Sequence, residues 1–312
     1  MKKILMLATG GTIACVPSAD GLVPALDGPA MIRLVPELEE VCTIEAKQIL
    51  NLDSSNLSPE HWQMLAEAIA ANYVYYDGFV ITHGTDTMAY TAAALSQMLH
   101  NCQKPVILTG AQLPIQAEGS DAADNIYHSF LAATSPLKGV ALVFGDLVIH
   151  GAHAKKLYTE SFNGFASINR APMATISHNH LFWEKKALQG GGFGEGEFSI
   201  NTKLETRVAV LKLIPGSAPD ILDYYASQGY KGLIIEGFGA GGVPNGANNW
   251  LPRLEQVLKQ GMKVICASQC LYDGVHLDTY PIGILAERLG AQSSGMDTLE
   301  TSVVKLMQEL AQ

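Results

Sequence analysis

A buried strand that ends in a double glycine opens the chain and sets its fold class. The apolar run Ile4–Ala8 is followed by Thr9-Gly10-Gly11-Thr12, and a short apolar run bounded by glycine predicts a buried strand. The two glycines let the backbone turn sharply and approach a ligand closely. In a parallel α/β sheet, ligands bind outside the carboxyl ends of the strands, where Thr12 would lie. Thr12 is therefore a candidate nucleophile; the alternative is a tight turn with a capping threonine.

Strands and helices alternate along the first part of the chain. The predicted strands are Ile4–Ala8, Val41–Leu52, Gly78–Thr82, Pro105–Thr109 and Val140–Phe144. Helices are predicted to begin at Ser58 and to run over about 88–100 and 120–133. This alternation is typical of an α/β fold in which helices cover both faces of a mostly parallel sheet. Three turns that follow strands, Gly10–Thr12, Gly84–Asp86 and Gly110–Ala111, would together form the rim of a pocket.

The composition changes between about Lys186 and Asn201, where Gly190–Gly196 is rich in glycine. Such a segment is typical of a linker between domains. We therefore predict a larger N-terminal catalytic α/β domain over 1–187, a linker over 188–205 and a smaller C-terminal α/β domain over 206–312. Strands are predicted in the C-terminal domain over 208–213, 232–235 and 263–267, and helices over 218–228, 250–260 and 298–310.

Charge and cysteine content exclude several classes of function. The net charge of −10 over 312 residues argues against binding to nucleic acid or to an anionic membrane. No apolar stretch is long enough for a membrane-spanning helix, and the N-terminus lacks the pattern of a signal peptide. The five cysteines are scattered without a Cys-x-x-Cys pair, as in a cytoplasmic protein with reduced thiols. The histidine pairs His150/His153 and His178/His180 have no further clustered ligands, so we expect no metal site.

Two glycine-containing segments allow alternative interpretations. Val16–Pro24 is rich in proline, glycine and small residues, and next to a candidate nucleophile it could be a mobile lid or a disordered surface loop. Gly237–Gly242 matches the dinucleotide-binding fingerprint. However, Pro244-Asn245-Gly246 stands where that motif needs a helix. We therefore expect no nicotinamide cofactor.

Two longer signatures point to a known family. Thr9–Ala14 and Thr82–Ala89, in this order, resemble signatures of the bacterial L-asparaginase family. The resemblance extends over the whole chain, including Ser268–Cys270, and Asp53–Ser55 resembles the cytoplasmic type I branch. It implies a two-domain amidohydrolase that converts L-asparagine to L-aspartate and ammonia without metal or cofactor. It also implies a homodimer or homotetramer in the cytoplasm.

The resemblance assigns roles to individual residues. The family's catalytic positions fall on Thr12, Thr85, Asp86 and Lys156. Its substrate-binding positions fall on Asp53, Ser54, Ser55 and Ala111. We also predict that the turn residues Gly11 and Gly84 contribute to substrate binding. The register of Phe162–Phe165 selects Lys156 rather than Lys155. Many members carry a lid tyrosine that is thought to help activate the first threonine, and Leu22 stands at that position here.

The chemistry of amide hydrolysis fits these residue types. A hydroxyl nucleophile divides the reaction into acylation and deacylation, and a threonine hydroxyl needs a base. We predict a relay of Thr85, Lys156 and Asp86, with an acyl intermediate on Thr12 and oxyanion donors from backbone N–H groups near Gly11 and Thr85. Which threonine attacks first is left open. The alternatives are a broader glutaminase-asparaginase, the ammonia-generating subunit of a tRNA-dependent amidotransferase, and a non-catalytic amino-acid-binding module.

The free amino-acid head of the substrate needs its own contacts. Hydroxyl and N–H groups of Ser54 and Ser55 would bind the α-carboxylate, and Asp86 would bind the α-ammonium. Ammonia release from asparagine would separate an enzyme from a binding module at once.

Overall fold

The computed structural model describes residues 1–19, 21–185 and 196–312. These residues form two compact units, Met1–Thr202 and Lys203–Gln312. The division falls inside the predicted linker of residues 188–205, of which 188–195 lie outside the described residues. Strand β14 (Ser199–Ile200) pairs with β6 (Leu99–His100), so this part of the stretch belongs to the first unit.

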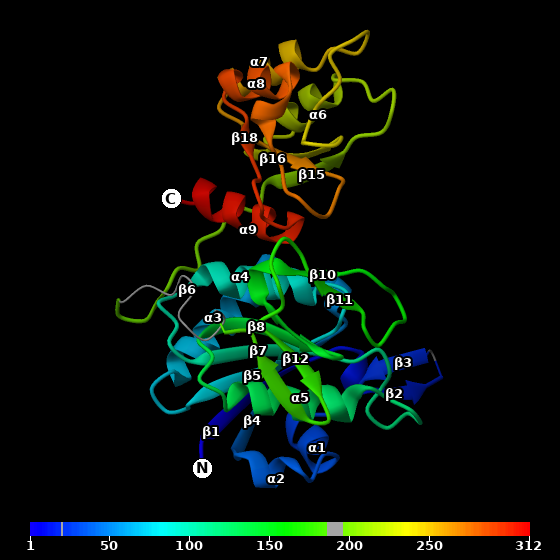
Figure 1. Ribbon diagram of the computed structural model, residues 1–312, viewed down its shortest axis with the longest axis vertical. Coiled ribbons are helices and arrows are strands. Elements are labelled where there is room, and N and C mark those ends of the chain that lie inside the picture. Colours follow the sequence, from blue (N-terminus) through cyan, green and yellow to red (C-terminus); the bar gives the residue numbers. More distant parts are fainter. Residues whose placement is uncertain (20, 186–195) are drawn as a thin grey trace. The chain divides into compact units, whose positions relative to one another are not determined.

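The first unit is built on an eight-stranded sheet with the order β13-β12-β9-β8-β7-β5-β1-β4 (Figure 1). Its strands are β1 (Lys3–Gly10), β4 (Thr43–Leu52), β5 (Gly78–Thr82), β7 (Pro105–Thr109), β8 (Gly139–Phe144), β9 (Leu147–His150), β12 (Ala174–Ser177) and β13 (His180–Trp183). Strands β4, β1, β5, β7 and β8 pair in parallel. Strands β9, β12 and β13 join antiparallel. The mostly parallel sheet is as predicted, and the antiparallel edge is an addition.

The strand order brings the predicted turns together. Strands β4, β1, β5 and β7 are consecutive neighbours and run in the same direction. The turns that follow them therefore emerge side by side at one edge of the sheet. These turns are Asp53–Ser55, Gly11–Thr12, His83–Asp86 and Gly110–Ala111.

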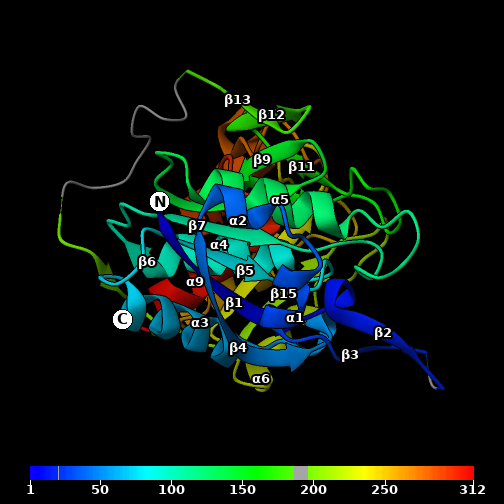
Figure 2. The ribbon, with the colours of Figure 1, turned by 90° about the horizontal axis from the view of Figure 1, so that it is seen from below.

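Helices cover both faces of this sheet, as predicted. They are α1 (Gly28–Arg33), α2 (Leu38–Val41) and α5 (Ala122–Ala133), and on the other face α3 (Pro59–Asn72) and α4 (Met88–Met98). Figure 2 shows α2 and α5 on one side of the sheet and α3 on the other. Alternate residues of β1 such as Ile4 and Met6 pack in one buried cluster with Phe130 of α5. Leu5 and Leu7 point the opposite way because successive side chains alternate along a strand.

Two segments of the first unit differ from the predictions in their local structure. For Val16–Pro24 the alternatives were a mobile lid and a disordered loop, and the described residues belong to an antiparallel hairpin of β2 (Cys15–Ser18) and β3 (Gly21–Pro24), so the disordered loop is wrong and the lid stays a prediction. The hairpin is largely exposed, so it lacks the apolar alternation that identifies a half-buried strand. The helix expected over 88–100 ends at Met98 because the next two residues form β6.

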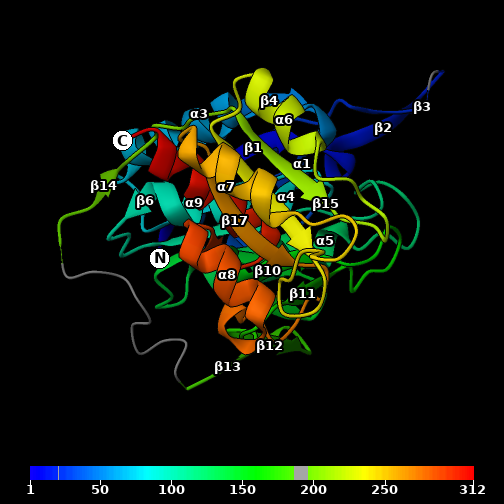
Figure 3. The ribbon, with the colours of Figure 1, turned by 90° about the horizontal axis from the view of Figure 1, so that it is seen from above.

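The second unit is a smaller α/β domain (Figure 3). Its parallel sheet contains β15 (Val208–Lys212), β16 (Gly232–Gly237), β17 (Lys263–Ser268) and β18 (Gln292–Ser293). Its helices are α6 (Ile221–Ser227), α7 (Leu251–Lys259), α8 (Pro281–Leu289) and α9 (Leu299–Leu310). Helix α8 was not predicted. After β16 the backbone folds back through a bridge between Phe238 and Gly242. The next helix begins only at Leu251, so the glycine-rich turn lacks the helix of a dinucleotide site.

Candidate active site

The Thr12 turn depends on glycine for a close contact with the turn after β5. Gly11 has φ of 78°, a left-handed conformation that favours glycine. Its N–H donates to Leu52 O at 3.0 Å. A Cβ atom on Gly11 would lie 2.3 Å from Gly84 N, so no side chain fits between the two turns. The next residue, Thr12, begins the short 3₁₀ helix Thr12–Ala14.

Gly11→Ala is expected to destabilise the protein by several kcal/mol more than Gly21→Ala. Both glycines have positive φ, and an unfavourable φ costs on the order of 1–3 kcal/mol. Only at Gly11 would the added methyl also strike backbone atoms, since nothing lies within 4 Å of the corresponding position at Gly21. The free energies of unfolding in urea give the comparison. Equal losses in the two variants would show that the turns can separate without cost.

The turns after β4 and β5 also touch. A Cβ atom on Gly84 would lie 2.6 Å from Ser54 Oγ, and Thr87 Oγ1 donates to Ser54 O at 2.8 Å. Asp53 accepts hydrogen bonds from the N–H and the hydroxyl of Ser55, at 2.8 and 2.6 Å. These bonds hold the pKa of Asp53 below its usual value. Asp53 is thus a carboxylate fixed by its own turn.

Lys156 reaches this site from a different part of the chain. It lies on β10 (Ala154–Lys156), which pairs with β11 (Phe165–Ser167). Its Nζ lies 2.8 Å from Thr85 Oγ1 and 2.6 Å from Asp86 Oδ1. The Lys156 side chain is 18% exposed and that of Asp86 62%. The structure therefore joins a hydroxyl, an amine and a carboxylate in one contact. Lys155 is the preceding residue of the strand, so its side chain points to the opposite face.

A cavity of about 150 Å³ lies over these turns. It is lined by Gly11, Thr12, Cys15, Leu22, Pro24, Asp53, Ser54, Gly84, Thr85 and Asp86. Seven of the predicted site residues are in this set, and Lys156 contacts two of them. Ser55 and Ala111 do not line the cavity. The β2–β3 hairpin adds Cys15, Leu22 and Pro24, and of these the sequence had pointed only to Leu22, through its place in the resemblance.

Ala111 lies close to the site although it does not line the cavity. It is 1% exposed. A Cβ atom on its neighbour Gly110 would lie 3.4 Å from Thr85 Cγ2. Further along the same loop, Ile115 N–H donates to Ile13 O at 3.3 Å. The loop 110–115 therefore contacts both threonine turns.

A buried hydrogen-bond chain supports the Gly84–Thr85 turn, and no sequence pattern had indicated it. His83 Nδ1 lies 2.7 Å from Gly84 O, and His83 Nε2 lies 2.8 Å from Thr91 Oγ1. The indole N–H of Trp62 donates to that hydroxyl at 3.1 Å. A carbonyl oxygen only accepts, so Nδ1 carries the proton and Nε2 accepts from Thr91. Burial lowers the pKa of His83 to about 4, which agrees with a neutral ring.

The neutral His83 makes stability depend on pH. The unfolded chain takes up a proton on this histidine near its ordinary pKa of 6.5, whereas the folded protein does so only near pH 4. The contribution of His83 to the free energy of unfolding is therefore at its maximum above pH 6.5 and falls as the pH is lowered toward 4. Between pH 7 and pH 5 the wild type should lose about 2 kcal/mol more than His83→Gln. Urea unfolding at both pH values measures the difference, and parallel losses would contradict a neutral buried ring.

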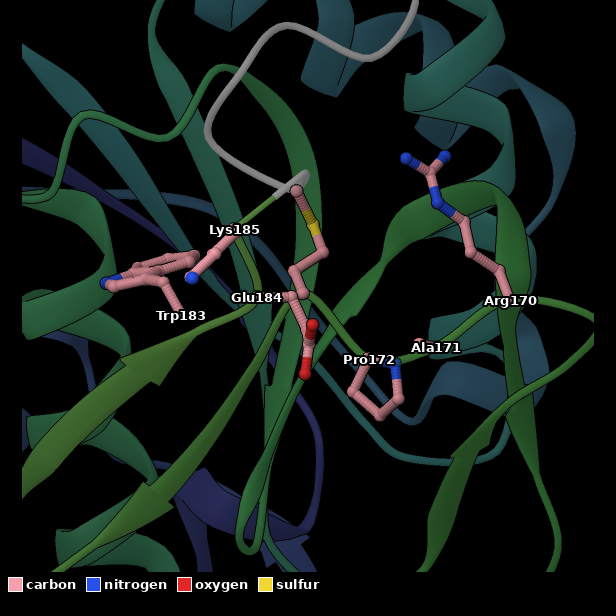
Figure 4. A pocket seen from close by; sticks show the side chains of 7 residues that line it. Arg170, Ala171, Pro172, Trp183, Glu184 and Lys185 are labelled. Carbon is pink, nitrogen blue, oxygen red and sulfur yellow. The ribbon is translucent and has the colours of Figure 1, made fainter.

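A larger cavity, of about 720 Å³, lies elsewhere in the first unit (Figure 4). It is lined by Arg170, Ala171, Pro172, Met173, Trp183, Glu184 and Lys185. Figure 4 shows Glu184 between Lys185 and Arg170. The residues that line the larger cavity include no hydroxyl or thiol nucleophile, so the smaller cavity is the candidate active site.

Among all described residues, no three His, Cys, Asp or Glu side chains gather as metal ligands. None of the helices in residues 1–19, 21–185 and 196–312 is long and apolar enough to cross a membrane.

Comparison with known proteins assigns both units to one family. The family description "Asparaginase, N-terminal" matches residues 3–189, and "Glutaminase/Asparaginase C-terminal domain" matches residues 207–312. The chain is 35% identical to an L-asparaginase of Thermococcus kodakarensis, covering 98% of this chain and 92% of the relative. It is 36% identical to a glutamyl-tRNA(Gln) amidotransferase subunit of Pyrococcus abyssi, covering 98% of this chain and 72% of the relative.

A solved structure is also similar. The thermostable L-asparaginase from Thermococcus kodakarensis superposes with a TM-score of 0.93 at 34% identity, covering 99% of this chain and 93% of that one. Both matched family descriptions, the sequence relatives and the fold agree with the resemblance noted from the two threonine signatures. The chain belongs to the asparaginase family.

Proposed function

We propose that this protein hydrolyses L-asparagine to L-aspartate and ammonia through an acyl-enzyme intermediate on Thr12. The observation that carries the proposal is the contact of Thr85 Oγ1, Lys156 Nζ and Asp86 Oδ1 beside a cavity that Thr12 also lines. A hydroxyl that is hydrogen-bonded to an amine, where a carboxylate orients that amine, is the arrangement of a catalytic triad. The family membership supports the same reaction.

The proposed acylation step uses both threonines. The Thr12 hydroxyl oxygen bonds to the side-chain carbonyl carbon of asparagine, and its proton passes to the Lys156 amine by way of Thr85. Asp86 stabilises the resulting ammonium. The C–N bond then breaks, and the nitrogen leaves as ammonia with the proton returned from Lys156. Water directed by Thr85 cleaves the ester and releases aspartate.

The predicted oxyanion donors near Gly11 and Thr85 can be narrowed to particular N–H groups. Gly11 N–H is engaged by Leu52 O, so it is not free to bind an oxyanion. We assign this role to the N–H groups of Thr12 and Thr85, which belong to the two facing turns. One such donor contributes about 3 kcal/mol to lowering the barrier.

The amino-acid head of the substrate would meet the turn after β4. Ser54 lines the cavity and is the proposed donor to the α-carboxylate. The Ser55 hydroxyl donates to Asp53 instead, so Ser55 acts mainly by holding that carboxylate. Asp53 and Asp86 both line the cavity and provide negative charge for the α-ammonium.

Activation of Thr12 would proceed without a phenol. Leu22 lines the cavity at the position of the family's lid tyrosine, and it is 53% exposed. No tyrosine is among the described residues that line this cavity. Tyr76, near the end of α3, donates its hydroxyl to Glu45. The Lys156–Thr85 pair is therefore the proposed base for both steps.

The purified full chain tests the substrate. We expect kcat/KM for L-asparagine to exceed that for L-glutamine at least about tenfold, because one extra methylene shifts the reacting carbonyl relative to fixed groups. Comparable values would favour a broader glutaminase-asparaginase. The relatives named as amidotransferase subunits support the other enzymatic alternative, an ammonia-generating subunit. Binding of asparagine without ammonia release would indicate a non-catalytic module.

The proposal includes the surroundings of the enzyme. We propose a cytoplasmic homodimer or homotetramer that uses no metal or cofactor. The location is supported by the free thiols at Cys15, Cys42, Cys102, Cys266 and Cys270, which suit a reducing compartment. Light scattering during size-exclusion chromatography measures the number of subunits.

A further inference from the structure

The start of helix α5 holds the loop that contains Ala111. The Asp121 carboxylate accepts from Gln112 N–H at 3.0 Å and from Leu113 N–H at 3.1 Å. It also accepts from Asn125 Nδ2 at 3.0 Å. Asp121 is only 9% exposed. A nearly buried carboxylate with this many donors is fixed in place, and so are the peptides that donate to it.

Asn125, one turn further along α5, completes this arrangement. Its Nδ2 donates to Gly110 O at 3.0 Å as well as to Asp121. Its Oδ1 accepts from Gly145 N–H at 3.0 Å. A flipped amide would place its NH₂ against the N–H of Gly145 and its oxygen against Gly110 O and the Asp121 carboxylate, so the partners determine the orientation. Asn125 is 1% exposed, and both of its amide hydrogens are used.

These contacts orient both peptide planes next to Ala111. In a trans peptide the C=O and the following N–H point in opposite directions. Gly110 O faces Asn125, so the N–H of Ala111 points away from α5. Gln112 N–H faces Asp121, so the carbonyl of Ala111 also points away from α5. Both backbone polar groups of Ala111 are thus directed away from helix α5, whose Asp121 and Asn125 bind the loop.

We propose that Asp121 and Asn125 are positioning residues that present the Ala111 carbonyl to the amide nitrogen of the substrate. The inference rests on the proposed function. Gly110 packs against Thr85, so the loop lies beside the reacting groups. A carbonyl oxygen accepts from the NH₂ of asparagine but has nothing to accept from the carboxylate of aspartate. This clamp, by which we mean Asp121 and Asn125 with their hydrogen bonds to the loop around Ala111, would therefore set the preference for the amide substrate over the acid product.

Asp121→Asn tests the clamp with little change in shape. An amide has one acceptor oxygen, so its NH₂ must face either the backbone N–H groups or Asn125 Nδ2, and a hydrogen bond is lost in both cases. Asp124→Asn is the matched control, because Asp124 lies in the same first turn of α5, is less buried than Asp121, and loses the same charge. A second variant, Asn125→Ala, removes the donor to Gly110 O in case Asp121→Asn does not fold.

We expect Asp121→Asn to change KM for asparagine much more than the inhibition constant of the product, L-aspartate. KM should rise about tenfold in Asp121→Asn, the effect of disturbing one buried hydrogen bond. The competitive inhibition constant of L-aspartate should change less than about threefold, since its head-group contacts remain. Asp124→Asn should match the wild type in both.

Two other outcomes overturn the proposal in distinguishable ways. If the wild type hydrolyses asparagine but both constants rise together or neither changes, the clamp has no role in amide recognition and the proposed function stands. If the wild type releases no ammonia from asparagine, the proposed function fails and the clamp's role fails with it.

Discussion

Replacing Lys156 with methionine is expected to lower kcat for L-asparagine by about 10⁴-fold, the effect of removing one member of a catalytic triad. Lys156 Nζ is the atom that joins Thr85 to Asp86. Methionine keeps a long unbranched stem, so packing along the side chain is largely retained. What is lost is the group that would take the proton from the nucleophile and return it to the leaving nitrogen.

Lys155→Met is the matched control for that experiment. The two lysines are adjacent on β10, and alternation along the strand directs their side chains to opposite faces. We expect Lys155→Met to lose less than about tenfold in kcat. Steady-state ammonia release gives both values, with circular dichroism as a check on folding. The reverse pattern would show that the other lysine reaches the threonines in the working enzyme.

Thr12→Ala should reduce turnover by a similar factor, about 10⁴-fold, because it removes the hydroxyl that forms the ester. Thr12→Ser is the informative control, since it keeps the hydroxyl and should retain measurable turnover. Binding should survive in Thr12→Ala, because the head-group contacts come from Ser54, Asp53 and Asp86. Titration calorimetry with L-aspartate should give nearly the same affinity as the wild type. Substantial turnover in Thr12→Ala would remove this residue from the nucleophile's role.

The turns of the site could be predicted because they follow from local rules. A buried strand followed by Gly-Gly-Thr specifies a sharp turn at the carboxyl end of a sheet. The 2.3 Å approach of a Cβ on Gly11 to Gly84 N is the physical reason for glycine there. Parallel neighbours then bring the Thr12 and Thr85 turns together.

Other features of the site required the tertiary structure. Trp62 and Thr91 are 29 residues apart on different helices, so no local spacing could connect them to His83. The Ser55 hydroxyl was expected to face the substrate, but it donates a hydrogen bond to Asp53, two residues before it, as short polar side chains often do in turns. The β2–β3 hairpin is mostly exposed, which removes the periodic signal of a strand.

The central claim is an aspartyl ester on Thr12, and rapid acid quenching followed by peptide mass spectrometry tests it most directly. The enzyme is mixed with L-asparagine, quenched during turnover and digested. We expect the peptide that contains Thr12 to carry the mass of one aspartyl group, with none in Thr12→Ala. Ammonia release by the wild type with an aspartyl group on the Thr85 peptide instead, and none on Thr12, would contradict the account.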